Sequence, residues 1–324
     1  MFDKTGSFHK LKQINRLAFL VTTAFIGLLS GCFSLGTHSD NLSHPKHKNA
    51  DLKWSLSRTN TNLPSKTSLA FGNQDQIYYS NVQKKGVINF SSTNSFKKIK
   101  PFIDLKEWVE TSAGKVPEPA GMEVDHQNRI VVADRGTGKL LRISSSARKL
   151  EVLADSYDGY RFSSVDDLRI DQKSQCYLSS KDSGVIYRVD LDSGQIDILN
   201  DRVINPEMIC IDPSADRLLF TEPVNARILS MSLDGTPSSE SPQTLIDFAP
   251  EVVTPIGLAF DQDELLYVSF GDLKQIRIYD LVKGVELKIL HLNQYAGKLR
   301  FHDGYLYVGG EEVITRFKLR SFRP

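Results

Sequence analysis

The chain of 324 residues is poor in the residue types and motifs from which catalytic and metal centres are most often built. It has three cysteines and seven histidines, and they do not cluster at the spacing of a zinc site. It also lacks a GxSxG elbow, an HExxH pair and a P-loop. The formal net charge is only +1, and no basic block or aromatic-interleaved basic stripe is present. These absences predict no nucleic-acid partner and no familiar catalytic motif.

The N-terminal apolar run, residues 17–30, is too short to span a bilayer as a helix. It has fourteen residues, whereas a spanning helix needs about 20. Four basic residues precede it, namely Lys4, Lys10, Lys12 and Arg16. A basic start, a short apolar core and small residues at its end are typical of a signal peptide, which we assign to residues 1–31.

Leu29-Ser30-Gly31-Cys32 follows this run and resembles the bacterial lipobox. The resemblance implies that Cys32 carries a diacylglycerol and an added acyl chain such as palmitate, becomes the new N-terminus and holds the protein on a lipid bilayer. We therefore expect a cell-envelope location. In a diderm host, Phe33 favours the outer membrane, on its periplasmic side or at the surface. The alternative is an ordinary secretory signal with a chance cysteine. Residues 32–50 are polar and are expected to form a flexible tether after the lipidated cysteine.

After removal of residues 1–31, the chain has 36 basic and 38 acidic residues and is nearly neutral. Beyond Cys32 it contains only Cys176 and Cys210, each within an apolar strand pattern. An exported protein could join them in a disulfide, but buried free thiols are also common, so the sequence leaves both states open.

A repeat of 40 to 50 residues dominates the rest of the chain. Each copy begins with an apolar strand pattern that ends in a polar or small residue, followed by two or three more alternating runs separated by turn residues. The first runs end at residues 72, 125, 171, 212, 261 and 302, which are 53, 46, 41, 49 and 41 residues apart. Period-two runs rich in Val, Ile, Leu and Tyr indicate strands, and four short strands per repeat are typical of propeller blades.

The sequence therefore predicts an all-β fold, a six-bladed β-propeller of four-stranded blades over residues 51–324. The expected blades lie near 64–104, 117–154, 162–200, 205–248, 254–290 and 295–320. The sixth repeat has room for only three strands. The alternating segment 51–57 lies before the first repeat and belongs to no other blade. We therefore expect it to pair as a strand with residues 313–319 and close the ring.

The segment Pro119–Asp134 of the second repeat resembles an NHL repeat, and the segment Pro255–Asp261 resembles the same motif. Residues 64–320 are similar to the six-bladed superfamily that includes gluconolactonase-like and strictosidine-synthase-like proteins. The resemblance to the gluconolactonase-like enzymes implies a divalent cation at the channel mouth, as those enzymes have. Its ligands are Glu in the first blade, Asn in the third and fourth, and Asp in the fifth, where the Asp is also the catalytic base.

This chain departs from that pattern. Five residues before each repeat end stand, in order, Thr67, Ala120, Asp166, Glu207, Ile256 and Gly297. Ile256 takes the place of the base, so no catalytic residue is predicted and the enzyme reading is disfavoured. Candidate channel-mouth binding residues are Asp166, Glu207, Thr67 and Glu118, with Lys66 and Lys298 as weaker candidates. Asp166 and Glu207 could hold a cation such as Ca²⁺ or a basic ligand, or could be solvated rim charges. No cofactor is otherwise predicted.

Two functions follow from this reading. The first is a membrane-anchored lipoprotein whose propeller serves as a binding or scaffolding platform and offers one face to a protein, glycan or small-molecule ligand. The alternative is a gluconolactonase-like hydrolase with a rearranged metal site.

Overall fold

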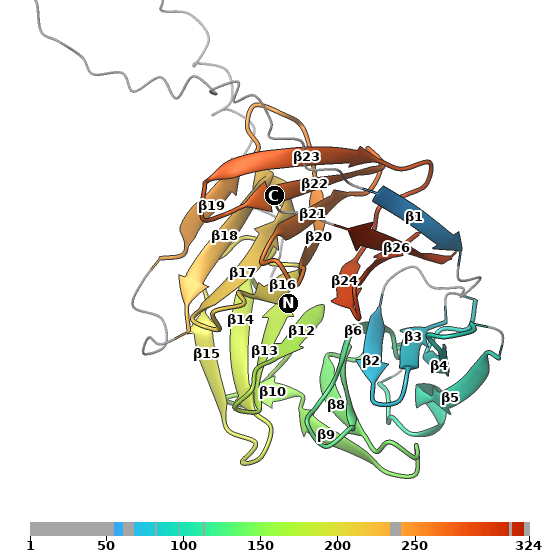
Figure 1. Cartoon of the computed structure of the whole chain (residues 1–324). Coiled ribbons are helices and arrows are strands. Elements are labelled where there is room, and N and C mark those ends of the chain that lie inside the picture. Colours follow the sequence, from blue (N-terminus) through green and yellow to red (C-terminus); the bar gives the residue numbers. More distant parts are fainter. Residues whose placement is uncertain are drawn as a thin grey trace, which may run out of the picture. The chain divides into compact units, whose positions relative to one another are not determined.

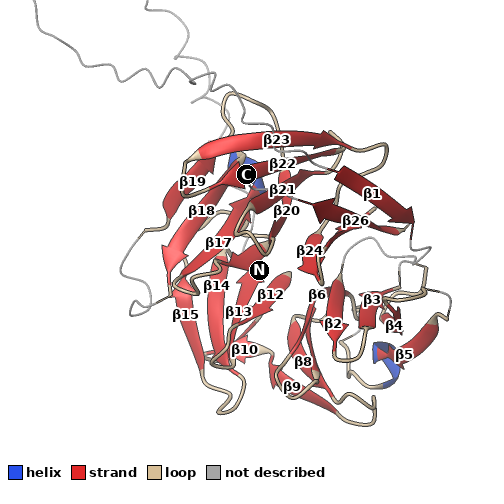
Figure 2. Cartoon of the chain, in the orientation of Figure 1, coloured by secondary structure: helices blue, strands red, loops and turns tan. Residues whose placement is uncertain are grey.

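A computed structural model describes residues 55–60, 68–81, 83–96, 98–112, 114–233, 241–310 and 313–320. The signal peptide, Cys32, the tether and Thr67 lie outside these ranges. Within them, the structure is a ring of six four-stranded antiparallel sheets (Figures 1 and 2). No helix in the described ranges is long and apolar enough to cross a membrane.

The six blades follow one another along the chain. The first blade contains β2 (Leu69–Gly72), β3 (Gln76–Ser80), β4 (Val87–Ser92) and β5 (Lys100–Asp104), and the second contains β6 (Pro119–Val124), β7 (Ile130–Asp134), β8 (Lys139–Ile143) and β9 (Leu150–Ala154). The third blade contains β12 (Asp167–Ile170), β13 (Gln175–Ser180), β14 (Val185–Asp190) and β15 (Ile196–Asn200), and the fourth contains β16 (Ile209–Ile211), β17 (Arg217–Glu222), β18 (Arg227–Ser232) and β19 (Gln243–Asp247). The fifth blade contains β20 (Pro255–Phe260), β21 (Leu266–Phe270), β22 (Gln275–Asp280) and β23 (Val285–His291), and the sixth contains β24 (Leu299–His302), β25 (Tyr305–Gly309), β26 (Ile314–Arg320) and β1 (Ser55–Asn60). A small hairpin, β10 (Ser156–Tyr157) and β11 (Tyr160–Arg161), precedes the third blade. The predicted fold class is confirmed.

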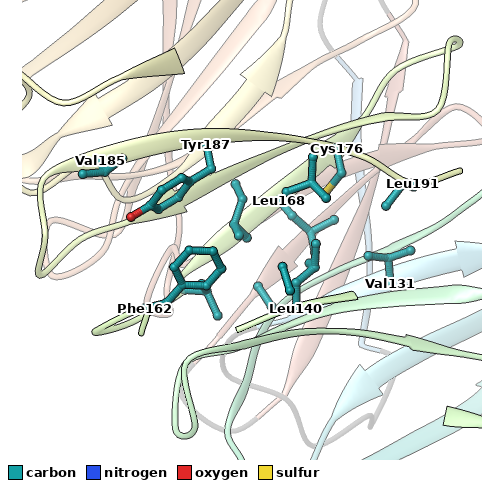
Figure 3. Close-up of a cluster of buried hydrophobic side chains, with 13 residues drawn as sticks. Val131, Leu140, Phe162, Leu168, Cys176, Val185, Tyr187 and Leu191 are labelled. Atoms are coloured by element: carbon teal, nitrogen blue, oxygen red, sulfur yellow. The ribbon is translucent and has the colours of Figure 1, made fainter. Parts of the chain in front are cut away.

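Burial along the strands explains their composition. All five residues of β7 and all five of β21 are buried, because the second strand of each blade is covered by the blades on both sides. Most residues of the outermost strand β19 are exposed or half-buried. The cores therefore lie between the blades. Figure 3 shows one such core, in which Val131 and Leu140 of the second blade pack with Leu168 and Cys176 of the third.

The last blade closes the ring as predicted. Strand β1 pairs antiparallel with β26, from Ser55 opposite Arg320 to Asn60 opposite Thr315. The strand extends three residues beyond the predicted segment 51–57, whose first four residues lie outside the described ranges. The ring seam itself is held by side chains of the sixth and first blades: His302 stacks on Phe71 at 4.1 Å between ring centroids, and the Arg316 guanidinium donates to the Thr93 carbonyl at 2.9 Å.

Two features of the repeat have local explanations. The aspartates that end several first strands accept hydrogen bonds from backbone N–H groups in the following turn; Asp261, for instance, accepts from Asp263 and Leu265. Gly121 lies where the inner strands of two blades approach, because a Cβ there would be 2.7 Å from the Cα of Asp167. Cys176 and Cys210 are both free thiols, each buried in a different inter-blade core.

Candidate site at the mouth of the central channel

The inner strands begin around a small cavity at one end of the central channel. Its volume is about 120 Å³, and its lining comprises Ala120, Arg135, Glu207, Met208, Ile256, Tyr295, Gly297 and Lys298. Four of these residues are among the six positions that the repeat placed five residues before each strand end. These four positions line one cavity because equivalent positions in successive blades converge on the channel axis.

Asp166 lies beneath this lining and is not a solvated rim charge. It is only 2% exposed, and its Oδ2 accepts hydrogen bonds from Ser164 Oγ at 2.9 Å and the Lys181 N–H at 2.8 Å. Its Oδ1 has no hydrogen-bond partner, although Arg135 Nη1 lies 3.7 Å away. Burial raises the pKa of Asp166 despite these hydrogen bonds and the nearby cations. The alternative in which Asp166 is a water-exposed charge is wrong.

The other two candidate carboxylates of the rim each pair with a cation. Glu207 Oε2 accepts from Lys181 Nζ at 3.1 Å, and its side chain is 23% exposed. Glu118 pairs with Arg135. Burial alone would lower the pKa of Arg135, but the hydrogen bond and charge of Glu118 raise it. Each carboxylate at the rim is thus already neutralised by a side chain of this chain.

Lys298 extends from the sixth blade into the channel mouth. Its Nζ donates to the Ala120 carbonyl at 2.7 Å and to the Asp166 carbonyl at 3.3 Å, and lies 3.5 Å from Asp167 Oδ1. Blades three and six are three places apart in a ring of six, so this side chain bridges the channel. Burial lowers the pKa of Lys298, and the charge of Asp167 opposes that effect.

A buried ionic cluster fills the channel next to Lys298. Asp167 is fully buried and accepts from Arg169 Nη1 at 3.0 Å, while Arg300 Nη2 lies 3.4 Å from its other oxygen. Burial by itself would raise the pKa of Asp167, but Arg169, Lys298 and Arg300 together lower it to about 2. Glu123 accepts from the Ile170 N–H in the same cluster, and its pKa is raised by burial.

The remaining wall of the cavity is apolar and aromatic. Ile256, Met208 and Tyr295 contribute it. Gly271 leaves the space in which the Tyr295 ring sits, because a Cβ at that position would lie 2.5 Å from Tyr295 Cε2 and 2.7 Å from Ile256 Cδ1. The cavity therefore offers one aromatic and aliphatic side and one side of paired charges.

These residues do not fit the divalent cation that the resemblance implies. A Ca²⁺ ion takes six to eight oxygen ligands, carboxylates among them. Ile256 offers no oxygen, and the Lys298 ammonium already takes the inward-facing carbonyls of Ala120 and Asp166. Among the described residues, no three His, Cys, Asp or Glu side chains gather to hold a metal ion. Asp166 and Glu207 are close to the channel mouth but are each bound to protein groups.

Sequence reasoning missed Arg135, Lys181 and Tyr295. The first two share a register, since each directly follows the second strand of its blade: Arg135 follows β7 and Lys181 follows β13. In an antiparallel blade, that loop lies at the same end as the start of the inner strand. A search of this second register for charged residues would have found both. Tyr295 precedes β24 in an irregular segment, where the repeat gave no guide.

The face that bears the cavity also carries most of the exposed large hydrophobic side chains. Ten are exposed among the described residues, and seven of them lie in the connections between strands at this end of the blades. They are Trp108, Val116, Tyr160, Ile204, Val224, Val252 and Leu273. These seven side chains come from connections of different blades.

Three comparisons with known proteins bear on this site. A gluconolactonase of Zymomonas mobilis is 25% identical over 184 residues, which cover 48% of this chain and 51% of that protein, so the match spans about half of either length. The structure of a gluconolactonase from Xanthomonas campestris superposes with a TM-score of 0.67 at 16% identity, covering 82% of this chain and 89% of that one. A luciferin-regenerating enzyme superposes with a TM-score of 0.65 at 12% identity, covering 83% and 98%.

At such identities the two structures show the fold alone. The family profile described as the SMP-30/Gluconolactonase/LRE-like region, however, matches residues 67–296. That range starts just before the first blade, ends within the cavity lining and includes most of the channel-mouth residues described above. The chain belongs to the SMP-30/Gluconolactonase/LRE-like family.

Proposed function

We propose that this protein is a lipid-anchored envelope protein whose propeller binds a neutral, hydroxyl-rich ligand, a sugar or the end of a glycan, at the channel mouth without a metal ion. The observation that carries the proposal is the lining of the cavity. Two ion pairs, Arg135–Glu118 and Lys181–Glu207, stand at the mouth with Tyr295 in the same cavity wall.

The charge balance of the site favours a neutral ligand. Five cations and five anions make up the mouth and the channel below it. They are Arg135, Arg169, Lys181, Lys298 and Arg300 against Glu118, Glu123, Asp166, Asp167 and Glu207. A charged ligand would displace one member of an ion pair from its partner and leave that partner unpaired beside the buried cluster of the channel, which is unfavourable. Hydroxyl groups can both donate to the carboxylates and accept from the guanidinium and ammonium groups, and an aromatic wall suits the apolar face of a sugar ring.

The binding site is tested by titrating the purified full chain with a panel of neutral monosaccharides, glycans and aldonolactones, using calorimetry and thermal shift. We expect at least one to bind. Glu207→Gln should weaken that binding roughly tenfold or more, because it removes a charged acceptor worth about 1.5 to 3 kcal/mol. Glu264→Gln is the matched control, since Glu264 is exposed in a loop between β20 and β21 at the opposite end of the blade. Equal loss in both variants, or binding of charged ligands only, would contradict the proposal.

The anchor is tested separately. Supporting it are the basic segment, the short apolar run and the lipobox-like Leu29–Cys32. Cys32→Ser should abolish labelling by a palmitate analogue and move the protein from the membrane fraction to the soluble or unprocessed pool, while Ser34→Ala should change neither. A wild-type protein that takes up no label and fractionates as soluble would refute the anchor.

A second candidate function, hydrolysis of a sugar lactone, is favoured by the family match over residues 67–296. The chemistry needs a base to take a proton from water. Ile256 cannot supply one, so this function would require Asp166 or Glu207 to do so. Both carboxylates are held by protein donors, which is why we rank hydrolysis second.

A further inference from the structure

The ammonium group of Lys298 is surrounded by oxygen atoms from two other blades. The Ala120 carbonyl belongs to the second blade, and the Asp166 carbonyl and Asp167 carboxylate belong to the third, at 2.7, 3.3 and 3.5 Å. A lysine ammonium has three N–H donors, and three oxygens face it. The side chain is only 15% exposed. Lys298 therefore donates two hydrogen bonds to main-chain carbonyls and pairs its charge with Asp167 inside the protein.

The oxygens in question come from main chain at the start of inner strands. Ala120 and Asp166 occupy equivalent positions in successive blades, five residues before the repeat ends at 125 and 171. Their carbonyls converge on the channel mouth, where they would repel one another unless a cation lay between them. Lys298, directly before β24 on the opposite side of the ring, supplies that cation from within the chain.

We propose that Lys298 is a built-in cation, which replaces a bound divalent ion in holding the inner strands of blades two, three and six together at the channel mouth. The cation cannot dissociate, is not removed by chelators and does not polarise a substrate. This inference deepens the proposed metal-independent site, but it concerns how the mouth is held together, so it can be tested without any ligand.

Lys298 acts through the backbone it holds and is a positioning residue. Arg300, two residues along, carries the second positive charge from the same blade to Asp167 at 3.4 Å. The two side chains divide the work. Lys298 donates hydrogen bonds to the carbonyls at the mouth, and Arg300 forms an ion pair with the Asp167 carboxylate deeper in the channel. A divalent ion at the position of Lys298 Nζ would be repelled by the positive charges of Arg300 and Arg135, which also act on the Lys298 ammonium. This repulsion is a second reason why the mouth favours an internal ammonium of single charge.

The first arm of the test uses the unmodified full chain. Its melting temperature should change by less than about 1 °C on adding millimolar Ca²⁺, Zn²⁺ or Mn²⁺, and also on treatment with EDTA. Metal analysis of the purified protein should find no stoichiometric divalent ion. A melting temperature that falls with EDTA, or a bound ion at one per chain, would overturn the inference whatever the ligand experiments show.

The second arm removes the ammonium. Lys298→Met keeps most of the side-chain volume and should lower the melting temperature by roughly 2 to 10 °C, because two carbonyls and a carboxylate lose their donor. The control Lys283→Met removes an exposed lysine paired with Asp280 in a loop at the other end of the blade and should change it by less than about 1 °C. A Lys298→Met protein that melts like the control would contradict the inference.

The third arm restores the cation from solution. Lys298→Ala removes three methylene groups and the ammonium, and the space opens to the cavity that Lys298 lines. Millimolar n-propylammonium should recover at least half of the lost melting temperature, whereas neutral n-propanol at the same concentration should not. Recovery by n-propanol equal to that by the amine would show that Lys298 merely fills space. If Lys298→Ala does not fold, the first two arms decide the question.

Discussion

Asp167→Asn removes the negative charge on which the channel cluster depends. Asp167 is fully buried and faces Arg169 at 3.0 Å, Lys298 at 3.5 Å and Arg300 at 3.4 Å. With an asparagine in its place, these three cations would be left with Glu123 as the carboxylate among them. The substitution preserves the shape of the side chain and keeps one oxygen as an acceptor for the Ile209 N–H. The other oxygen becomes an amide NH₂, so both the negative charge and one acceptor facing the cations are lost.

Breaking a buried ion pair by removing one partner costs about 3 to 5 kcal/mol. For a domain of this size, 1 kcal/mol corresponds to about 2 to 4 °C in melting temperature, so we expect a fall of roughly 6 to 20 °C. The pKa of Asp167, about 2 in the folded chain against an ordinary 3.8, accounts for about 2 kcal/mol of this cost. The free energy obtained from the pKa is smaller than the 3 to 5 kcal/mol because burial of the carboxylate, which raises the pKa, already offsets part of the attraction of the three cations.

The sign of the pH dependence follows from the same pKa. A carboxyl group whose pKa is lower in the folded chain stabilises the fold above about pH 4 and loses that contribution as the pH falls towards 2. The difference in stability between wild type and Asp167→Asn should therefore be constant near neutral pH and shrink below about pH 4.

The assay is thermal and urea unfolding followed by circular dichroism, with Asp192→Asn as the matched control. Asp192 is exposed in the turn between β14 and β15. Because its charge stays in water, this control should melt within roughly 2 °C of wild type. If Asp167→Asn also melts within 3 °C of wild type, the cluster does not hold the inner strands and the reasoning is wrong.

Two further predictions concern packing and closure. Deleting residues 51–60 removes β1 and exposes the edge of β26, so the melting temperature should fall by roughly 5 °C or more and aggregation should increase. Deleting residues 33–50 should change neither property. Equal melting temperatures of the two deletion variants would refute closure by β1. Gly271→Ala should push the Tyr295 ring from its place, since the added Cβ would lie 2.5 Å from it, and should weaken sugar binding more than it lowers stability; unchanged binding in a folded variant would remove Tyr295 from the site.

Much of the fold could be predicted because a propeller repeats one local pattern. The period-two runs gave the strands, and the spacing of their ends gave six blades. The short last repeat indicated that another segment must complete it, and β1 does so. The described part of β1 extends three residues beyond the predicted segment, because residues 58–60 are polar and carry no alternation that would have placed them in a strand.

The candidate site was predicted less completely for a physical reason. Position in the repeat tells which residues reach the channel mouth, and it correctly gave Glu207 and Ile256. It does not tell how deep a side chain lies or what it pairs with. Asp166 is buried, and Ser164 and Lys181 donate to one of its oxygens. The Lys298 side chain, a weaker candidate in the sequence, crosses to blades on the other side of the ring. Such contacts between distant blades leave no trace in the spacing of a single sequence.

The central claim is that this channel mouth works without a metal ion, and turnover tests it most directly. The initial rate of aldonolactone hydrolysis by the purified full chain should equal the uncatalysed rate with EDTA and also with added Ca²⁺, Zn²⁺ or Mn²⁺. Metal-dependent hydrolysis that is abolished by Asp166→Ala would contradict the account and establish the lactonase function in its place.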